Sequence, residues 1–143
     1  MLKSAKTVAE AQNFLKATAL STGLSSHAAA MLQRLLGEFL NVNGVDQATV
    51  IDDRGRLLSC VGGEGQLPLT QRAVELTVAA LDAVQNSGLG DLQEVWVEGK
   101  ASTCIDIITP YRILMLSGGT GNIARWRHSV DHLRQQLATT QEL

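Results

Sequence analysis

The last third of the chain, residues 92–138, constrains the fold most strongly. It contains three strand-like apolar runs in close succession, at 92–98, 101–108 and 111–117. Short turns separate these runs, which predicts three consecutive strands in a meander. A glycine-rich turn follows, and one amphipathic segment then continues to about Ala138. The stretch therefore predicts three strands closed by a helix.

The preceding part of the chain predicts a helix, a hairpin and a second helix. Apolar residues at i, i+3, i+4 and i+7 spacing indicate a helix from about Ser26 to Leu40. Two short runs rich in apolar and β-branched residues, Val45–Asp52 and Arg56–Val61, flank a turn and predict a β-hairpin. A middle helix is then expected from about Leu69 to Asn86.

Residues 4–21 predict a further helix at the N-terminus. Thr7 and Glu10 have the spacing of a capping box, and Gly23 ends the segment. We therefore expect an N-terminal helical extension at 1–23 and a domain at 24–143.

The middle helix is apolar over most of its circumference. On a helical wheel, Val74, Val78 and Leu81 lie on one side, whereas Leu76 and Ala80 lie on the other. A helix with this distribution is expected to be buried on two faces. Two explanations remain open: either another subunit or the N-terminal helix covers the second face.

The first strand of the meander has the pattern of an edge or interface strand. Glu94, Trp96 and Glu98 alternate with Val95 and Val97, so charges flank an aromatic residue on one face.

Two further features of the meander are predicted from its sequence. Gly99 and Lys100 suit a two-residue hairpin loop with glycine first. The strand at Arg112–Ser117 is apolar on both faces, which predicts a central position in the sheet.

Composition excludes several classes of protein. With 143 residues, 18% charged residues and a net charge of −2, the chain fits one globular domain without a basic surface for nucleic acid. It has no apolar run long enough to span a membrane and no signal-peptide pattern, so we expect a cytoplasmic protein. Cys60 and Cys104 are expected to be reduced core residues.

A possible nucleotide motif occurs at Gly119–Ala124, which matches the G-x-G-x-x-A form of the dinucleotide fingerprint. That fold needs a second parallel strand after the helix, and the few residues beyond Ala138 leave no room for one. The glycines are therefore expected to form a strand-to-helix turn. An anion site at the N-terminus of the last helix remains a weaker alternative.

The sequence contains no other catalytic or metal-binding pattern. His128 and His132 have i, i+4 spacing, but Ser129 replaces the glutamate of the H-E-x-x-H motif. No nucleophile is grouped with a base. We therefore predict that the protein is not an enzyme and that it has no cofactor, catalytic residue or metal site.

Five segments together resemble the roadblock / dynein light chain family over about residues 26–139. They occur in the family's order along the chain: Gly44-Val45, Ala48–Asp52, Gly55–Ser59, Leu92–Glu98 and Gly121–Arg125. The resemblance implies an α+β fold, a roadblock/profilin-like sandwich with a five-stranded antiparallel sheet. One helix would cover one face and two helices the other. The N-terminal helix would be an addition to this fold.

The resemblance also implies a dimer in which the middle helices pack together and the third strands pair. This places the predicted interface on six residues: Val74, Val78, Leu81, Val95, Trp96 and Val97. Family members typically regulate or scaffold small Ras-like GTPases, and one of them activates a bacterial polarity GTPase. A homodimer that binds such a GTPase, with Arg72 and Glu75 as partner-contacting residues, is therefore expected. The alternative is a small-ligand sensor domain with a pocket between the sheet and a helix.

Overall fold

A computed structural model of the protein describes residues 26–119 and 122–140. The predicted helix at 4–21 and the extension at 1–23 lie outside these residues. The described elements, in chain order, are α2 (Ser26–Phe39), β1 (Val45–Ile51), β2 (Leu57–Gly62), the 3₁₀ helix η2 (Gly63–Gly65), α3 (Thr70–Gln85), β3 (Glu94–Glu98), β4 (Ser102–Thr109), β5 (Arg112–Gly118) and α4 (Ile123–Thr139).

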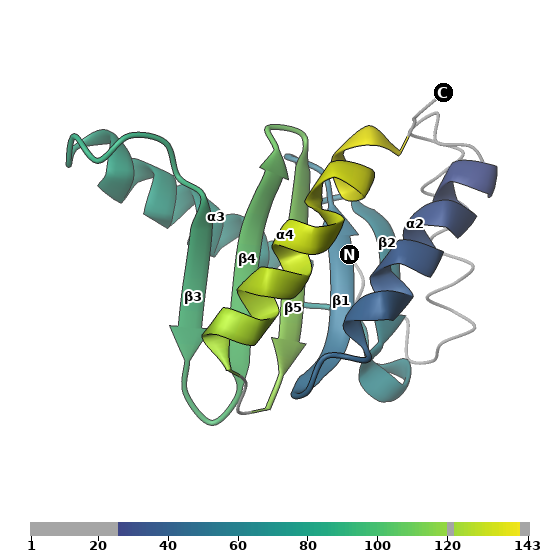
Figure 1. The fold of residues 1–143 in the computed structure, drawn as a ribbon. Helices are drawn as coiled ribbons and strands as arrows, with labels where there is room; N and C mark the ends of the chain where they lie inside the picture. The colour runs from purple at the N-terminus through teal and green to yellow at the C-terminus, as the bar shows by residue number, and fades with distance from the viewer. Residues whose placement is uncertain (1–25, 120–121, 141–143) are drawn as a thin grey trace.

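The five strands form one antiparallel sheet in the order β2-β1-β5-β4-β3 (Figure 1). β5 lies at the centre, which confirms the prediction made from its apolar residues. β3 lies at one edge, as its charged alternation indicated. The fold class and the five-stranded antiparallel sheet are therefore confirmed.

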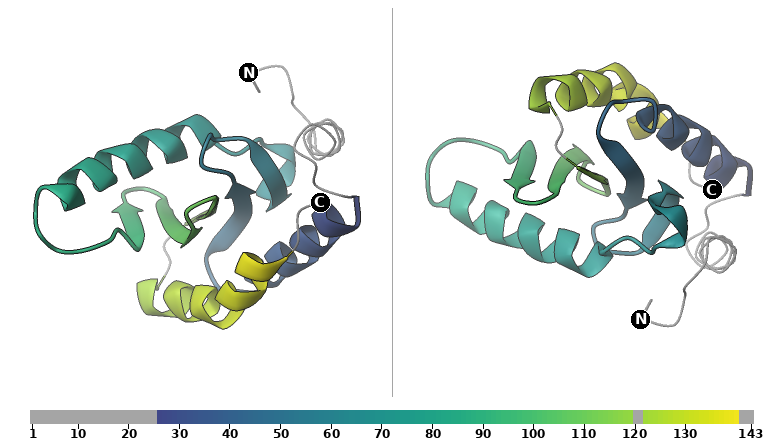
Figure 2. Two further views of the ribbon diagram at one scale, coloured as in Figure 1. Left: turned by 90° about the horizontal axis from the view of Figure 1, so that it is seen from above. Right: turned by 90° about the horizontal axis from the view of Figure 1, so that it is seen from below.

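Helices cover both faces of the sheet (Figure 2). α2 and α4 lie on one face and α3 lies on the other. The larger hydrophobic core forms beneath α2 and α4, where Phe39, Leu116 and Trp126 are fully buried. A smaller core beneath α3 includes Ala73 and Ile105. The sheet is thus more completely covered on the α2–α4 side than on the α3 side.

The turn between β1 and β2 is organised by a single carboxylate. Oδ1 of Asp52 accepts hydrogen bonds from the backbone N–H groups of Arg54 at 2.9 Å and Arg56 at 2.8 Å. Gly55 adopts a positive φ of 84°, which a side chain would disfavour. The predicted turn is confirmed, and these contacts explain its sequence.

The loop between β3 and β4 differs from the prediction. Glu98 pairs with Ser102, so three residues, and not two, connect the strands. Gly99 does not have a positive φ, whereas a two-residue loop that begins with glycine requires one. Its N–H group instead donates to the carbonyl of Ala101 at 3.0 Å. The prediction of a two-residue loop was therefore wrong.

No helix within residues 26–119 and 122–140 is long and apolar enough to cross a membrane.

Candidate interaction surface

One flank of α3 presents apolar side chains to solvent. Ala73 and Thr77 are buried against the sheet, whereas Val78 is 51% exposed and Leu81 is 41% exposed. Val74 lies between these extremes. Large apolar side chains exposed together on one helix are a common feature of protein interaction surfaces and ligand grooves.

A cavity of about 340 Å³ runs along this flank. Val74, Val78 and Leu81 form one wall, and the sheet residues Ile107 and Ile113 contribute to the other. The predicted interface residues of α3 are therefore brought together beside a recess that can receive apolar side chains.

β3 provides an open sheet edge next to α3. It pairs with β4 on one side and has no strand on its other side within the described chain. Val95 packs into the small core beneath α3, and Val97 is 42% exposed. An edge strand presents unpaired N–H and C=O groups that can pair with another strand.

Trp96 points to the opposite face of the sheet from Val95 and Val97. Its ring packs edge-on against Trp126 of α4, with the ring centroids 5.1 Å apart. The structure thus separates Trp96 from the predicted interface residues of α3, as the alternation of β3 requires. Its indole N–H is buried and has no hydrogen-bond partner among the described residues.

Two ion pairs attach α4 to the edge of the sheet. Arg127 Nε lies 2.8 Å from Oε1 of Glu94, and Arg134 Nη1 lies 2.7 Å from Oδ1 of Asp106. Glu94 and Asp106 are directly opposite each other on β3 and β4. Burial raises the pKa of the Glu94 carboxyl group and the Asp106 carboxylate adds to the increase, whereas Arg127 lowers it.

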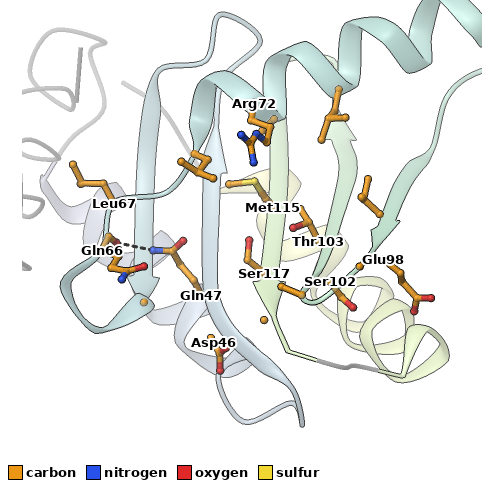
Figure 3. Close-up of a pocket in the computed structure, with 18 residues that line it drawn as sticks. Asp46, Gln47, Gln66, Leu67, Arg72, Glu98, Ser102, Thr103, Met115 and Ser117 are labelled. Carbon is orange, nitrogen blue, oxygen red and sulfur yellow. Dashed lines mark hydrogen bonds between the residues drawn. The ribbon is translucent and has the colours of Figure 1, made fainter. Parts of the chain in front are cut away.

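Arg72 and Glu75 are both exposed on α3. Arg72 makes no ion pair within residues 26–119 and 122–140 and overlooks a groove beneath the N-terminal half of α3 (Figure 3). Its guanidinium group is therefore available to a partner or ligand.

The groove has a volume of about 540 Å³ and lies between α3, the loop after β2 and one end of the sheet. Its floor includes Gln47, Thr103 and Ser117, which the sequence analysis did not identify. Other polar residues occur in the same three strands, so no strand taken alone distinguishes these positions. The register of β1, β5 and β4 places them side by side in a row, and this register cannot be read from the sequence.

The described elements do not have the topology of a dinucleotide-binding fold. The sheet is antiparallel throughout, and α4 is the last described element. The side-chain oxygen of Asn122 accepts hydrogen bonds from the backbone N–H groups of Ala124 at 3.0 Å and Arg125 at 3.2 Å. These two donors at the helix N-terminus are therefore already used within the chain, which weakens the alternative of an anion site there.

The two cysteines do not belong to a metal site among the described residues. Cys60 and Cys104 are free thiols, and burial raises the pKa of each. Across the part of the chain that the structure describes, no group of three or more His, Cys, Asp or Glu residues is placed to hold a metal ion.

Residues 31–105, more than half of the chain, match the Roadblock/LC7 domain family. The chain belongs to this family. A search of curated proteins found no match.

Solved structures show the same fold. The gliding protein MglB of Thermus thermophilus superposes with a TM-score of 0.68 at 20% identity, covering 84% of this chain and 95% of that one. An MglB structure with a tetrameric arrangement gives 0.69 at 20% identity, covering 84% and 94%. MglB of Myxococcus xanthus gives 0.68 at 16% identity, covering 80% and 90%.

Proposed function

We propose that this protein is a dimeric scaffold or regulator that binds a small Ras-like GTPase in the cytoplasm. The observation that carries the proposal is the exposed apolar flank of α3 beside the open edge of β3. Membership of the Roadblock/LC7 family supports it, because members of this family typically act on such GTPases.

The dimer would bury apolar surface and complete the sheet at the same time. Val74, Val78 and Leu81 would pack against the second copy, and β3 would pair with its counterpart through Val95 and Val97. Trp96 would contribute from the other face, by fixing β3 against α4. A two-fold interface of this kind uses one surface patch on both subunits.

The GTPase would contact two of the charged side chains that α3 leaves exposed, Arg72 and Glu75. Regulation can then proceed in two ways. The dimer can order the catalytic groups of the GTPase itself, or Arg72 can supply a positive charge in trans. An arginine supplied in this way accelerates hydrolysis by about 10³–10⁵.

GTP hydrolysis by small GTPases encoded near this protein's gene, measured with and without the protein, tests the proposal. We expect the protein to bind one of these GTPases and to change its rate of GTP hydrolysis. A protein that acts only as a scaffold would bind the GTPase without changing the rate. If the protein bound none of these GTPases and changed the hydrolysis rate of none of them, the proposal would be refuted.

The contribution of Arg72 is tested by Arg72→Ala, with Arg125→Ala as the matched control. Arg125 is exposed on α4, on the other side of the sheet. Loss of stimulation with Arg72→Ala alone supports a contribution in trans, whereas full stimulation excludes it.

A further inference from the structure

The groove beneath α3 has a polar floor, whereas β4 and β5 carry apolar residues further along the same face. On β4, Ile105 packs under α3, and two residues nearer the groove the same face carries Thr103. On β5, Met115 packs under α3, and Ser117 follows on the same face. On these two neighbouring strands the change from apolar to polar side chains therefore occurs at the same level.

The polar side chains form a continuous row across three adjacent strands. Gln47 of β1 is the register partner of Ser117 on β5, and Ser117 is the register partner of Thr103 on β4. Figure 3 shows the three side chains on the floor of the groove, with Arg72 extending over them from α3. We call these three residues the polar row.

The orientation of the Gln47 amide is fixed by the protein. Gln47 is only 9% exposed, and its Nε2 donates to the carbonyl oxygen of Gln66 at 2.9 Å. The loop that carries Gln66 is itself tightly placed, because a Cβ at Gly63 would clash with Nε2 of Gln47. Oε1 accepts no hydrogen bond from the described residues and can therefore accept one from a ligand, while Nε2 keeps one further N–H.

The hydroxyl groups of the polar row have no side-chain hydrogen bond within the described part of the chain. Neither Ser117 nor Thr103 forms a side-chain hydrogen bond with any residue in 26–119 or 122–140. Both hydroxyls can accept or donate, and Arg72 above them donates. A polar floor of this kind, with its hydrogen-bonding capacity unused, is characteristic of a ligand site that fixes orientation through a few polar groups.

These groups define the chemistry of the ligand. The guanidinium of Arg72 and the two hydroxyls suit a carboxylate or phosphate oxygen. Oε1 of Gln47 needs an O–H or N–H donor, and the carboxylates of Asp46 and Glu98, which line the groove away from Arg72, also favour donors (Figure 3). A purely anionic ligand would satisfy only one side of this site.

We propose that the groove binds a small organic anion, a carboxylate or a phosphate ester, that also carries a hydrogen-bond donor. The anionic oxygens contact Arg72, Ser117 and Thr103, and the donor contacts Oε1 of Gln47. This site goes beyond the proposed regulation of a GTPase, since it gives the protein a ligand of its own.

The test is a titration of the isotopically labelled full chain, followed by NMR, with four named compounds. Inorganic phosphate supplies an anion without organic hydroxyl groups, glycerol supplies those hydroxyl groups without an anion, and glycerol 3-phosphate and glycerate supply both with the two kinds of anion. We expect saturable shifts at Gln47, Thr103 and Ser117 with glycerol 3-phosphate, glycerate or both. Phosphate or glycerol alone should bind more weakly.

Two variants assign the binding to the proposed contacts. Arg72→Gln should weaken binding about tenfold, as expected for loss of a charge-assisted hydrogen bond. Arg125→Gln, which removes an exposed arginine from α4, should leave binding unchanged. Thr103→Val, which is close in shape, should also weaken binding and provides an independent variant.

Three results would overturn the proposal. One is no saturable shift with any of the four compounds, and another is equal weakening by Arg72→Gln and Arg125→Gln. The third is that the NMR signals of the polar row shift when the protein concentration changes but do not shift when any of the four compounds is added. A second copy of the chain would then fill the groove. No GTPase enters this experiment, so its outcome is independent of the proposed function.

Discussion

At the scale of single residues, Gly55 links the β1–β2 turn to α3. Its φ is 84°, and a Cβ built on it would lie 2.8 Å from Cγ2 of Val74. Gly55→Ala should therefore destabilise the protein through both backbone strain and a clash, by about 1–3 kcal/mol.

Gly88→Ala is the matched control for this substitution. Gly88 has a φ of 70°, but a Cβ there meets nothing within 4 Å. It should therefore show the cost of strain alone, about 1–2 kcal/mol. Urea unfolding of both variants measures the difference between their free energies of unfolding. Equal losses of stability would show that the Val74 side chain moves aside at no cost.

Glu94 should make the stability of the folded protein depend on pH. Its pKa is raised in the folded protein, first by burial, so the folded state holds this proton more tightly than the unfolded state. The stabilisation linked to this proton is complete below the unfolded glutamate pKa of about 4.3 and is lost as the pH rises through the folded value. Glu94→Gln, which stays uncharged, should thus be more stable than the native protein near neutral pH.

The advantage of Glu94→Gln should shrink as the pH falls toward 4. Unfolding midpoints measured across this range provide the check, with Glu98→Gln on the exposed end of β3 as the control. A glutamine variant that is less stable at neutral pH would mean that the ion pair with Arg127 outweighs the cost of burying the carboxylate.

At the scale of elements, Arg112 of β5 holds the C-terminal end of α4. It is buried, and its guanidinium donates to the carbonyl oxygen of Leu137 at 2.7 Å and to that of Thr140. Arg112→Met should destabilise the protein by about 2–4 kcal/mol, because charge-assisted hydrogen bonds to buried carbonyls are lost.

Arg125→Met on the exposed side of α4 is the control for Arg112→Met and should change stability by less than about 0.5 kcal/mol. Thermal unfolding compares the two variants. Similar small effects would show that the hydrogen bonds of Arg112 contribute little to holding α4.

The helices and strands were largely predictable from the sequence, whereas the loop between β3 and β4 and the register between neighbouring strands were not. Periodicity located α2, α3, α4 and all five strands, and the alternation of β3 predicted that Trp96 points away from Val95 and Val97. The length of the β3–β4 loop was missed, because the backbone conformation of Gly99 is not visible in its residue type. The polar row was missed because it depends on the register between strands that are far apart in sequence.

At the scale of the whole molecule, α3 and β3 together form the proposed dimer interface. Val78→Glu places a charge on the exposed apolar flank, where the monomer has room for it but a packed interface does not. The variant should remain folded and dissociate, with its dimer dissociation constant raised at least about 100-fold. The control is Val97→Thr, which should weaken the dimer only slightly, because the β-branched side chain is kept at the strand edge.

The mass of the native chain in solution tests the central claim most directly. Sedimentation equilibrium at micromolar concentration should give twice the mass of the 143-residue chain, and Val78→Glu should give the mass of a single chain. A native protein that remains a single chain even at high micromolar concentration would contradict the account, because the α3 flank and the β3 edge would then have no second copy to cover them.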